Sequence, residues 1–285
     1  MTVATNSKNI GLIEPDALFA ERLQQVDSNT MTEQDSGFEL STELSSVETG
    51  LFDRVWEDHC HFYAGDSLGI GIAGLAGGAI MANSSIDEHL RHKVQQNIRS
   101  ASSDEWFEML HAQKELGNGL YTLPLFAASW MVGEYFDDDP RAVMVGDWGE
   151  RSLRAFAVGV PPMLLTQRLT GASRPGESEN DSHWNPLNDD NGVSGHSFMG
   201  AIPFLTAARM TDDPKLKFLY YTGSTLAPLS RVNDDSHYTS QAFLGWGFAW
   251  LATRAVFKTD SANQNWQINP ILFDDKQGVA FTYQW

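Results

Sequence analysis

The sequence has little cysteine, little positive charge and no clean run of about 20 apolar residues, the length that a membrane span requires. Its single cysteine, Cys60, excludes an internal disulfide framework. Lysine and arginine number 19 against 37 aspartate and glutamate residues, so the formal net charge is −18. Because nucleic-acid binding needs clustered cations, nucleic acid is excluded as a partner, and anionic membrane surfaces are disfavoured on the same ground.

The longest uncharged stretch, residues 67–86, is diluted by Asn83, Ser84, Ser85 and several glycines. This favours a soluble bundle, with membrane association left open. The chain as given opens without a basic region followed by an apolar stretch, so a secretion signal is not visible. We expect a cytoplasmic protein or, if the true start lies upstream, a periplasmic or membrane-associated one.

The first 50 residues differ in composition from the rest. They are rich in acidic residues, serine and threonine, and Lys8 and Arg22 are their only cations. Such a segment cannot bury enough apolar surface to offset its chain entropy. We expect residues 1–50 to form an acidic, mobile arm and residues 51–285 to form a single helical domain, which is long enough to bury a sizeable core.

From Leu51 onward, apolar residues return with helical spacing between Gly, Pro, Asn and Asp residues. The expected helices cover residues 66–83, 86–99, 103–114, 119–135, 147–169, 195–210, 214–227 and 237–257. Period-two alternation is confined to residues 266–269 and 279–285, which flank a turn-forming run and predict a short β-hairpin. The predicted fold class is all-α, a helical bundle with a C-terminal hairpin.

Three short polar segments interrupt the apolar helices between residues 167 and 241. They are Arg174-Pro175, Ser194-Gly195-His196, and the run from Ser230 and Arg231 to His237. Arginine presents a planar fork of donors to an oxyanion, and a helix N-terminus presents free N–H groups. The two arginines, two histidines and one helix start therefore predict a site for phosphoryl transfer.

These segments resemble the three motifs of the type 2 phosphatidic acid phosphatases, a family that shares its fold and site with the vanadium haloperoxidases. The motif KxxxxxxRP falls on residues 167–175, with Gln167 in the lysine position. The motif PSGH falls on residues 193–196, with Val193 in place of proline. The motif SRxxxxxHxxxD falls on residues 230–241, with Gln241 in place of aspartate. The resemblance covers residues 55–258 and implies a bundle of the phosphatase and haloperoxidase type.

The resemblance also implies roles for the site residues. His237 is the expected nucleophile, which leaves a phosphohistidine, and we expect it at the solvent end of its helix. His196 is the expected general acid for the leaving group and later the base for water. Gln241 lies four residues after His237 on one helical face and can fix its ring without adding charge. The expected phosphate-binding residues are Gln167, Arg174, Ser194, Gly195 and Arg231.

The predicted activity is metal-independent hydrolysis of a phosphomonoester, of either a lipid or a small molecule, without a cofactor. Two alternatives stay open. The same residues would bind vanadate as a phosphate analogue, which makes a vanadate-dependent haloperoxidase the first alternative. The missing charges at Gln167 and Gln241 motivate the second, a phosphate-binding protein with weak or no catalysis. If histidine basicity limits the rate, Gln241→Glu is predicted to raise it.

Other polar features have plainer interpretations. Ser194 taken alone is an N-cap. The segment His59-Cys60-His61 has zinc-type donors without a second ligand pair, so no metal site is expected. The helix expected over residues 86–99 begins with the charged run Asp87 to Lys93, which is most simply a solvated face.

Overall fold

The structure, a computed structural model, describes residues 50–99, 109, 111–177, 181–273 and 276–283, and the surroundings of side chains up to residue 262. The expected acidic arm, up to Thr49, and most of the helix expected over residues 103–114 lie outside the described residues. One compact unit spans Thr49–Asp260, and the rest of the described chain belongs to a second unit.

The described chain is mostly helical, as the sequence predicts. Its helices are α2 (Leu51–Phe62), α3 (Gly65–Ala82), α4 (Ile86–Lys93), the π-helix η1 (Val94–Ile98), the 3₁₀-helix η3 (Gln113–Gly117), α6 (Gly119–Tyr135), α7 (Pro140–Thr170), α8 (Gly195–Met210), α9 (Pro214–Gly223), α10 (Leu226–Asn233) and α11 (Thr239–Asn265). The start of α7 lies seven residues before the predicted one, because the Asp139 side chain accepts the N–H of Arg141 and Pro140 occupies the first turn.

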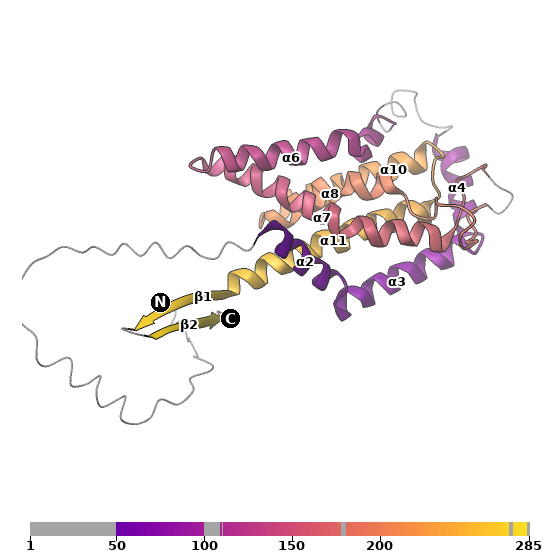
Figure 1. Cartoon of the computed structure of the whole chain (residues 1–285). Helices are drawn as coiled ribbons and strands as arrows, with labels where there is room; N and C mark the ends of the chain where they lie inside the picture. The colour runs from indigo at the N-terminus through magenta and orange to yellow at the C-terminus, as the bar shows by residue number, and fades with distance from the viewer. Residues whose placement is uncertain (1–49, 100–108, 110, 178–180, 274–275, 284–285) are drawn as a thin grey trace, which may run out of the picture. The chain divides into compact units, whose positions relative to one another are not determined.

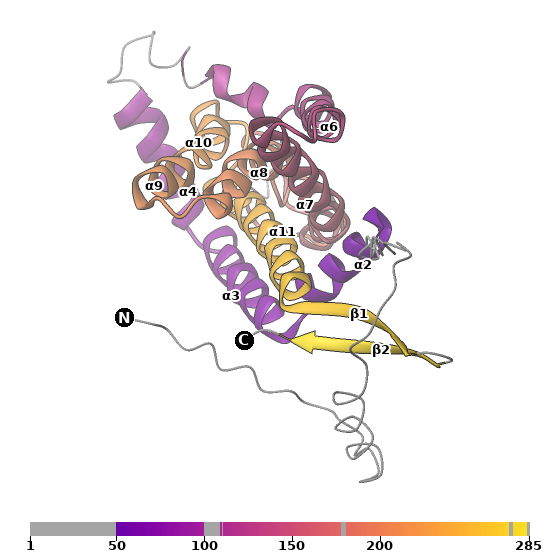
Figure 2. The ribbon, with the colours of Figure 1, turned by 90° about the vertical axis from the view of Figure 1, so that its left-hand side faces the viewer.

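Up to Asp260, α11 forms the centre of the bundle, with α3 on one side and α7 on the other (Figure 2). A Cβ atom added at Gly245 would lie 2.2 Å from the carbonyl oxygen of Ser194, and one added at Gly159 would lie 3.0 Å from Ala252 Cβ. Glycine therefore lets α8 and α7 approach α11 closely. Most of the buried apolar core lines this contact: Ala155, Val158, Phe198, Ile202, Leu205, Leu244, Phe248, Ala249, Ala252 and Val256.

α3 is apolar after its first turn, which holds Asp66 and Ser67. It packs on α11 through glycine, since a Cβ atom added at Gly78 would lie 2.8 Å from the Leu244 side chain. Asp66 at its first turn pairs with Arg254, with 2.7 Å between Oδ2 and Nη2. Within the described chain, α3 is the one helix whose length and composition would suffice to cross a membrane.

α6 and α7 form an antiparallel pair and lie side by side (Figure 1). A Cβ atom added at Gly133 would lie 2.6 Å from the Cα atom of Gly146, so the two backbones are nearly in contact. The outer face of α6 is apolar, and it exposes Leu120, Met131 and Tyr135. Apolar faces of this kind are typical of contacts with another protein or a membrane.

A buried ionic cluster joins α2, the middle of α7 and the later part of α11. The Arg154 guanidinium donates to both Asp58 carboxylate oxygens, at 2.7 and 2.8 Å, and to Asp260 Oδ1 at 2.7 Å. Because Asp58 is fully buried, removing Arg154 would leave its carboxylate without this partner, which is strongly destabilising.

The second unit contains two paired strands. β1 (Trp266–Phe273) and β2 (Lys276–Tyr283) are antiparallel, with Trp266 opposite Tyr283 and Phe273 opposite Lys276.

Candidate functional site

The segment between α7 and α8 folds back over the end of α7. α7 ends at Gly171, whose φ of 59° is in the left-handed region, and a Cβ atom there would lie 1.8 Å from the carbonyl oxygen of Asn185. The Asn191 N–H donates to the Ala172 carbonyl at 3.1 Å. These contacts bring the residues just before Arg174 and just before Ser194 together.

Ser194 is the N-cap of α8. Its side chain is buried, and its Oγ accepts the N–H of Ser197 at 3.3 Å. The capping role expected of an isolated serine is therefore present. The N–H groups of Gly195 and His196, in the first turn of α8, have no acceptor within the helix, and such groups are typical binding points for an anion.

His237 lies on the link between α10 and α11 and is only 5% exposed. The expectation that it sits at the solvent end of its helix is therefore wrong. The start of α11 packs against α8, where the Ser194 N–H donates to the Gln241 carbonyl at 2.9 Å. His237, two residues before α11, is thus enclosed, and its ring is largely shielded from water.

The Gln241 amide fixes the His237 ring in one tautomer. Its Oε1 lies 2.9 Å from His237 Nδ1 and accepts the Tyr238 backbone N–H at 3.1 Å. Its Nε2 donates to the Ser173 carbonyl at 2.7 Å. A backbone N–H can only donate and a carbonyl can only accept, so the amide cannot be flipped. Nδ1 of His237 therefore carries the proton, and Nε2 carries a free lone pair.

Gln241 also joins the three motif segments. Its side chain contacts Ser173 in the first segment and His237 in the third, while its carbonyl accepts from Ser194 in the second. It is 1% exposed, so these hydrogen bonds are shielded from water. A glutamine reaches the Ser173 carbonyl as a donor, which a carboxylate in the same place cannot do.

The two motif arginines differ in burial. The Arg231 side chain is 12% exposed, its Nη1 lies 3.8 Å from Asp234 Oδ2, and its buried Nε has no hydrogen-bond partner among the described residues. The Arg174 side chain is 47% exposed and lies 3.9 Å from Glu177. Arg231 therefore holds an unsatisfied donor, which a bound oxyanion would satisfy.

Burial and positive charge together lower the histidine pKa values. The pKa of His237 is lowered to about 3, mainly by burial and further by Arg174 and Arg231, against the opposing effect of the Gln241 hydrogen bond. The pKa of His196 is lowered by burial and by the same two arginines. The two arginines and two histidines therefore share one electrostatic environment, and His237 is neutral at neutral pH.

Gln167 is engaged with the backbone. Its Nε2 donates to the Val193 carbonyl at 2.6 Å, which ties the last turn of α7 to the residue before Ser194. Its neighbour Arg168 pairs with Asp190 at 3.0 Å. Gln167 thus anchors the segment that carries Ser194, and Arg168 contacts the connecting segment.

Compared with known proteins, the chain matches no family model, no curated protein and no solved structure. Its function is therefore inferred from the site geometry and from the three motifs.

α4 supplies residues to the site that the sequence interpretation missed. Asp87 is 1% exposed and accepts hydrogen bonds from Ser240. Arg91 donates two hydrogen bonds to the Asp235 carboxylate. The solvated face predicted for this helix is therefore wrong at Asp87 and Arg91. Their side chains contact Asp235 and Ser240, which lie more than 140 residues later in the chain. The local sequence gives no indication of contacts this distant.

A second group that the sequence did not indicate lies before α6. His111 Nδ1 lies 2.9 Å from Asp234 Oδ2, and Lys114 Nζ lies 2.8 Å from His111 Nε2. Asp234 in turn approaches Arg231. After burial and the two arginines, Glu115 raises the His196 pKa and Lys114 lowers it, so the two charges of this segment act on the site in opposite directions.

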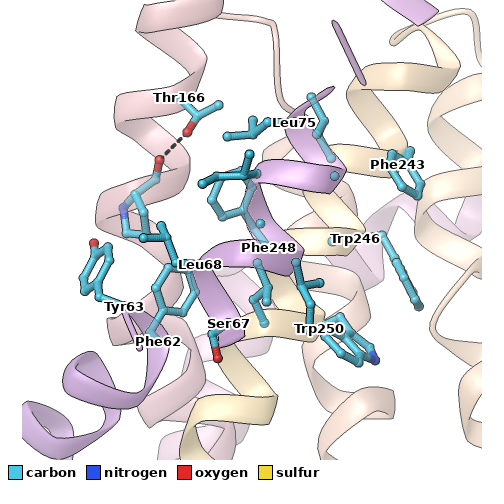
Figure 3. Close-up of a pocket in the computed structure, with 18 residues that line it drawn as sticks. Phe62, Tyr63, Ser67, Leu68, Leu75, Thr166, Phe243, Trp246, Phe248 and Trp250 are labelled. Atoms are coloured by element: carbon cyan, nitrogen blue, oxygen red, sulfur yellow. Dashed lines mark hydrogen bonds between the residues drawn. The ribbon is translucent and has the colours of Figure 1, made fainter. Parts of the chain in front are cut away.

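An apolar cavity of about 250 Å³ lies between α3 and α11 (Figure 3). Its lining includes Leu68 and Leu75 of α3, and Phe243 and Phe248 of α11. Thr166, the neighbour of Gln167, also lines it, and its hydroxyl donates to the Pro162 carbonyl at 2.8 Å. Two of its lining residues, Thr166 and Phe243, therefore lie within two positions of Gln167 and Gln241 along the chain. The lining offers almost no polar group to a ligand.

In the part of the chain that the structure describes, no group of three or more His, Cys, Asp or Glu residues is arranged to hold a metal ion.

Proposed function

We propose that the protein hydrolyses a phosphomonoester through a phosphohistidine on His237, in a bundle of the phosphatidic acid phosphatase type. One observation carries the proposal: the Gln241 amide leaves the lone pair of His237 Nε2 free beside two arginines. A neutral, fixed imidazole in a positive potential is suited to attack an electrophilic phosphorus atom. The ordered three-motif pattern supports the same conclusion.

In the first step, Nε2 of His237 forms a bond to phosphorus while the bond from phosphorus to the ester oxygen breaks. Protonated His196 gives its proton to the leaving alkoxide, which departs as an alcohol. In the second step, water attacks phosphorus, His196 takes a proton from that water, and the bond from phosphorus to Nε2 breaks. Inorganic phosphate leaves and His237 is restored.

The transferred phosphoryl group is held by charge rather than by covalent chemistry. The guanidinium groups of Arg231 and Arg174 and the N–H groups of Gly195 and His196 are the donors for its equatorial oxygens. Arg231 supports this assignment most directly, because its buried Nε lacks a partner among the described residues. Phosphoryl transfer depends mainly on such positioning and charge.

The apolar cavity between α3 and α11 supports a substrate with an apolar alcohol group. Its aromatic and aliphatic lining would bury a hydrocarbon chain, while it offers few polar groups to a sugar or another polar alcohol. A lipid-like phosphate is therefore the proposed substrate. Alkyl phosphates should show a kcat/KM that rises with the length of the alkyl chain. The kcat/KM for p-nitrophenyl phosphate should lie below that of the long-chain alkyl phosphates.

A panel of phosphomonoesters assayed with the full-length protein tests the proposal. Rapid alkaline denaturation preserves the acid-labile phosphorus–nitrogen bond, so a labelled substrate should leave phosphohistidine in the parent and none in His237→Gln. The matched control is His92→Gln, an exposed histidine on α4, which should leave labelling unchanged. Labelling that persists in His237→Gln would remove the nucleophile assignment.

The same protein samples separate the alternatives. Halide oxidation by peroxide that starts when vanadate is added would replace the phosphatase proposal with a haloperoxidase. A rise in melting temperature with phosphate or vanadate, without product from any ester, would leave an anion-binding protein.

A further inference from the structure

One face of α4 and η1 contacts both ends of the link that carries His237. The face consists of Asp87, Arg91 and Gln95, which are spaced four residues apart and so lie one above another along a helix. Their partners lie 137 to 153 residues later in the chain. Three successive turns of one helix therefore hold a single short segment.

The end of α10 is a Schellman turn without glycine. The Ser236 N–H donates to the Arg231 carbonyl at 3.0 Å, and the Asp235 N–H donates to the Val232 carbonyl at 3.2 Å. Asp235 has a φ of 53°, the left-handed position that glycine usually occupies. Arg91 holds this aspartate through Nε to Oδ1 at 2.7 Å and Nη2 to Oδ2 at 2.8 Å.

Gln95 contacts the carbonyl groups at the end of α10. Its Nε2 donates to the Val232 carbonyl at 3.0 Å and to the Asn233 carbonyl at 3.2 Å. Carbonyl groups in the last turn of a helix have no partner within it. Gln95 therefore caps α10 from outside, on the same side as Arg91.

Asp87 caps the start of α11. Its Oδ1 accepts the Ser240 N–H at 2.9 Å, and its Oδ2 accepts the Ser240 hydroxyl. A carboxylate at a helix N-terminus interacts favourably with the helix dipole. Burial raises the pKa of Asp87, against the opposing Ser240 hydrogen bonds, so the carboxylate is enclosed at this contact.

We propose that the polar face of α4 and η1 is a positioning element for the nucleophile: by fixing the end of α10 and the start of α11, Asp87, Arg91 and Gln95 set where Nε2 of His237 lies. The inference rests on the proposed function of His237. The link is short, because only Ser236 and His237 separate Asp235 from Tyr238, the residue before α11. Its position is therefore set by the two helix ends that it joins.

The His237 ring depends on both helices. Its backbone N–H donates to the Arg231 carbonyl of α10 at 3.2 Å, while its Nδ1 is held by Gln241 of α11. Arg91 also lies over the Tyr238 ring, at 5.9 Å from the ring centre. A change in the spacing of α10 and α11 would move Nε2 relative to the phosphate donors, and a displacement of about 1 Å lowers a rate by roughly 100-fold.

The test compares Arg91→Met and Asp235→Gly in the full chain with p-nitrophenyl phosphate as substrate. Asp235→Gly removes the carboxylate, yet suits the left-handed backbone, so folding is retained. Each variant should lower kcat by about 10- to 100-fold and change KM by less than about twofold, since the phosphate donors are untouched. The double variant should be no slower than the slower single variant, because both remove one contact.

Asp66→Ala is the matched control. It removes an ion pair between another helix and the far part of α11, at Arg254, and should leave kcat unchanged. Asp87→Ala should also lower kcat, and Asp87→Asn, which keeps an acceptor for the Ser240 N–H, should recover part of it. An unchanged kcat in Arg91→Met and Asp235→Gly, or an equal loss in Asp66→Ala, would overturn the proposal.

Nitrogen-15 NMR of the histidine rings separates this inference from the proposed function. The parent should show His237 as the neutral tautomer with a proton on Nδ1, and Arg91→Met and Asp87→Ala should show a mixture of tautomers. If the parent hydrolyses no phosphomonoester, the proposed function fails and the ring spectrum alone decides the positioning claim. A His237 ring signal identical in parent and variants would overturn it.

Discussion

Oε1 of Gln241 lies 2.9 Å from Nδ1 of His237, and the amide that carries this oxygen is held by two backbone groups. The tautomer of the histidine is thereby fixed by a neutral side chain. A carboxylate would fix the same tautomer and also raise the basicity of the ring. Here the ring stays weakly basic, and its pKa is lowered to about 3 by burial, with a further contribution from the arginines.

The pH dependence of kcat/KM should be bell-shaped and lie on the acid side. His237 must be neutral to attack, so the rate falls as pH drops through its pKa of about 3. His196 must be protonated to assist the leaving group, so the rate falls as pH rises through its pKa, which burial and the arginines place below the ordinary 6.5. Steady-state rates across pH check this. A basic limb above pH 7 that persists in His196→Gln would contradict the assignment.

Acid should destabilise the fold through His237. Its pKa is about 3 in the folded chain against an ordinary 6.5, so unfolding takes up a proton between these values. Its contribution to stability is therefore fully present above pH 6.5 and is lost as pH falls toward 3, with a limiting slope of about 1.4 kcal/mol per pH unit. Urea unfolding of the parent and His237→Gln at pH 4.5, 5.5 and 7 measures the difference. Parallel curves would argue against a buried neutral ring.

Arg231→Lys should impair turnover more than Arg174→Lys. Loss of an oxyanion donor raises the barrier by about 2 kcal/mol or more, roughly 30-fold in rate. That loss applies to Arg231, which is largely buried, whereas the half-exposed Arg174 is screened by water and its effect should be smaller. The ratio of the two kcat/KM values is the measurement. Equal or reversed effects would show that the phosphate lies on the Arg174 side.

Gln241→Glu should slow the enzyme and destabilise it, whereas the sequence predicted a faster rate if histidine basicity limits turnover. The second oxygen of the introduced carboxylate would face the Ser173 carbonyl, where the amide now donates. A buried acceptor without a donor costs about 1 to 3 kcal/mol. Because the protonated acid can donate, the loss should shrink as pH falls. Unfolding free energies and single-turnover rates across pH check both effects, and a gain in rate at neutral pH would restore the original expectation.

Helix positions were predictable wherever the sequence marks their ends. Asp213 and Pro214 begin α9, and Gly171 ends α7. The break at Ser224 and Thr225 was missed, since neither residue stops a helix by itself. The fold class and most helix bounds therefore followed from local chemistry.

The site was predictable only where its residues share a short segment. The contact between His237 and Gln241 follows from their four-residue spacing, because such residues lie on one helical face. Asp87 and Arg91 gave no such signal, since a charged helix facing water and one facing a distant polar link have the same local sequence. The burial of His237 was missed for the same reason: it is set by the packing of α11 on α8, which local spacing does not specify.

Several contacts that assemble the site end on main-chain atoms. Gln241 donates to the Ser173 carbonyl, Gln167 donates to the Val193 carbonyl, and Ser194 donates its own N–H. Every amino acid carries these atoms, so the partner positions can change identity during evolution without losing the contact. The geometry of the site therefore depends on the path of the backbone more than on the identity of the partner residues. It can be retained after the sequence around it has diverged.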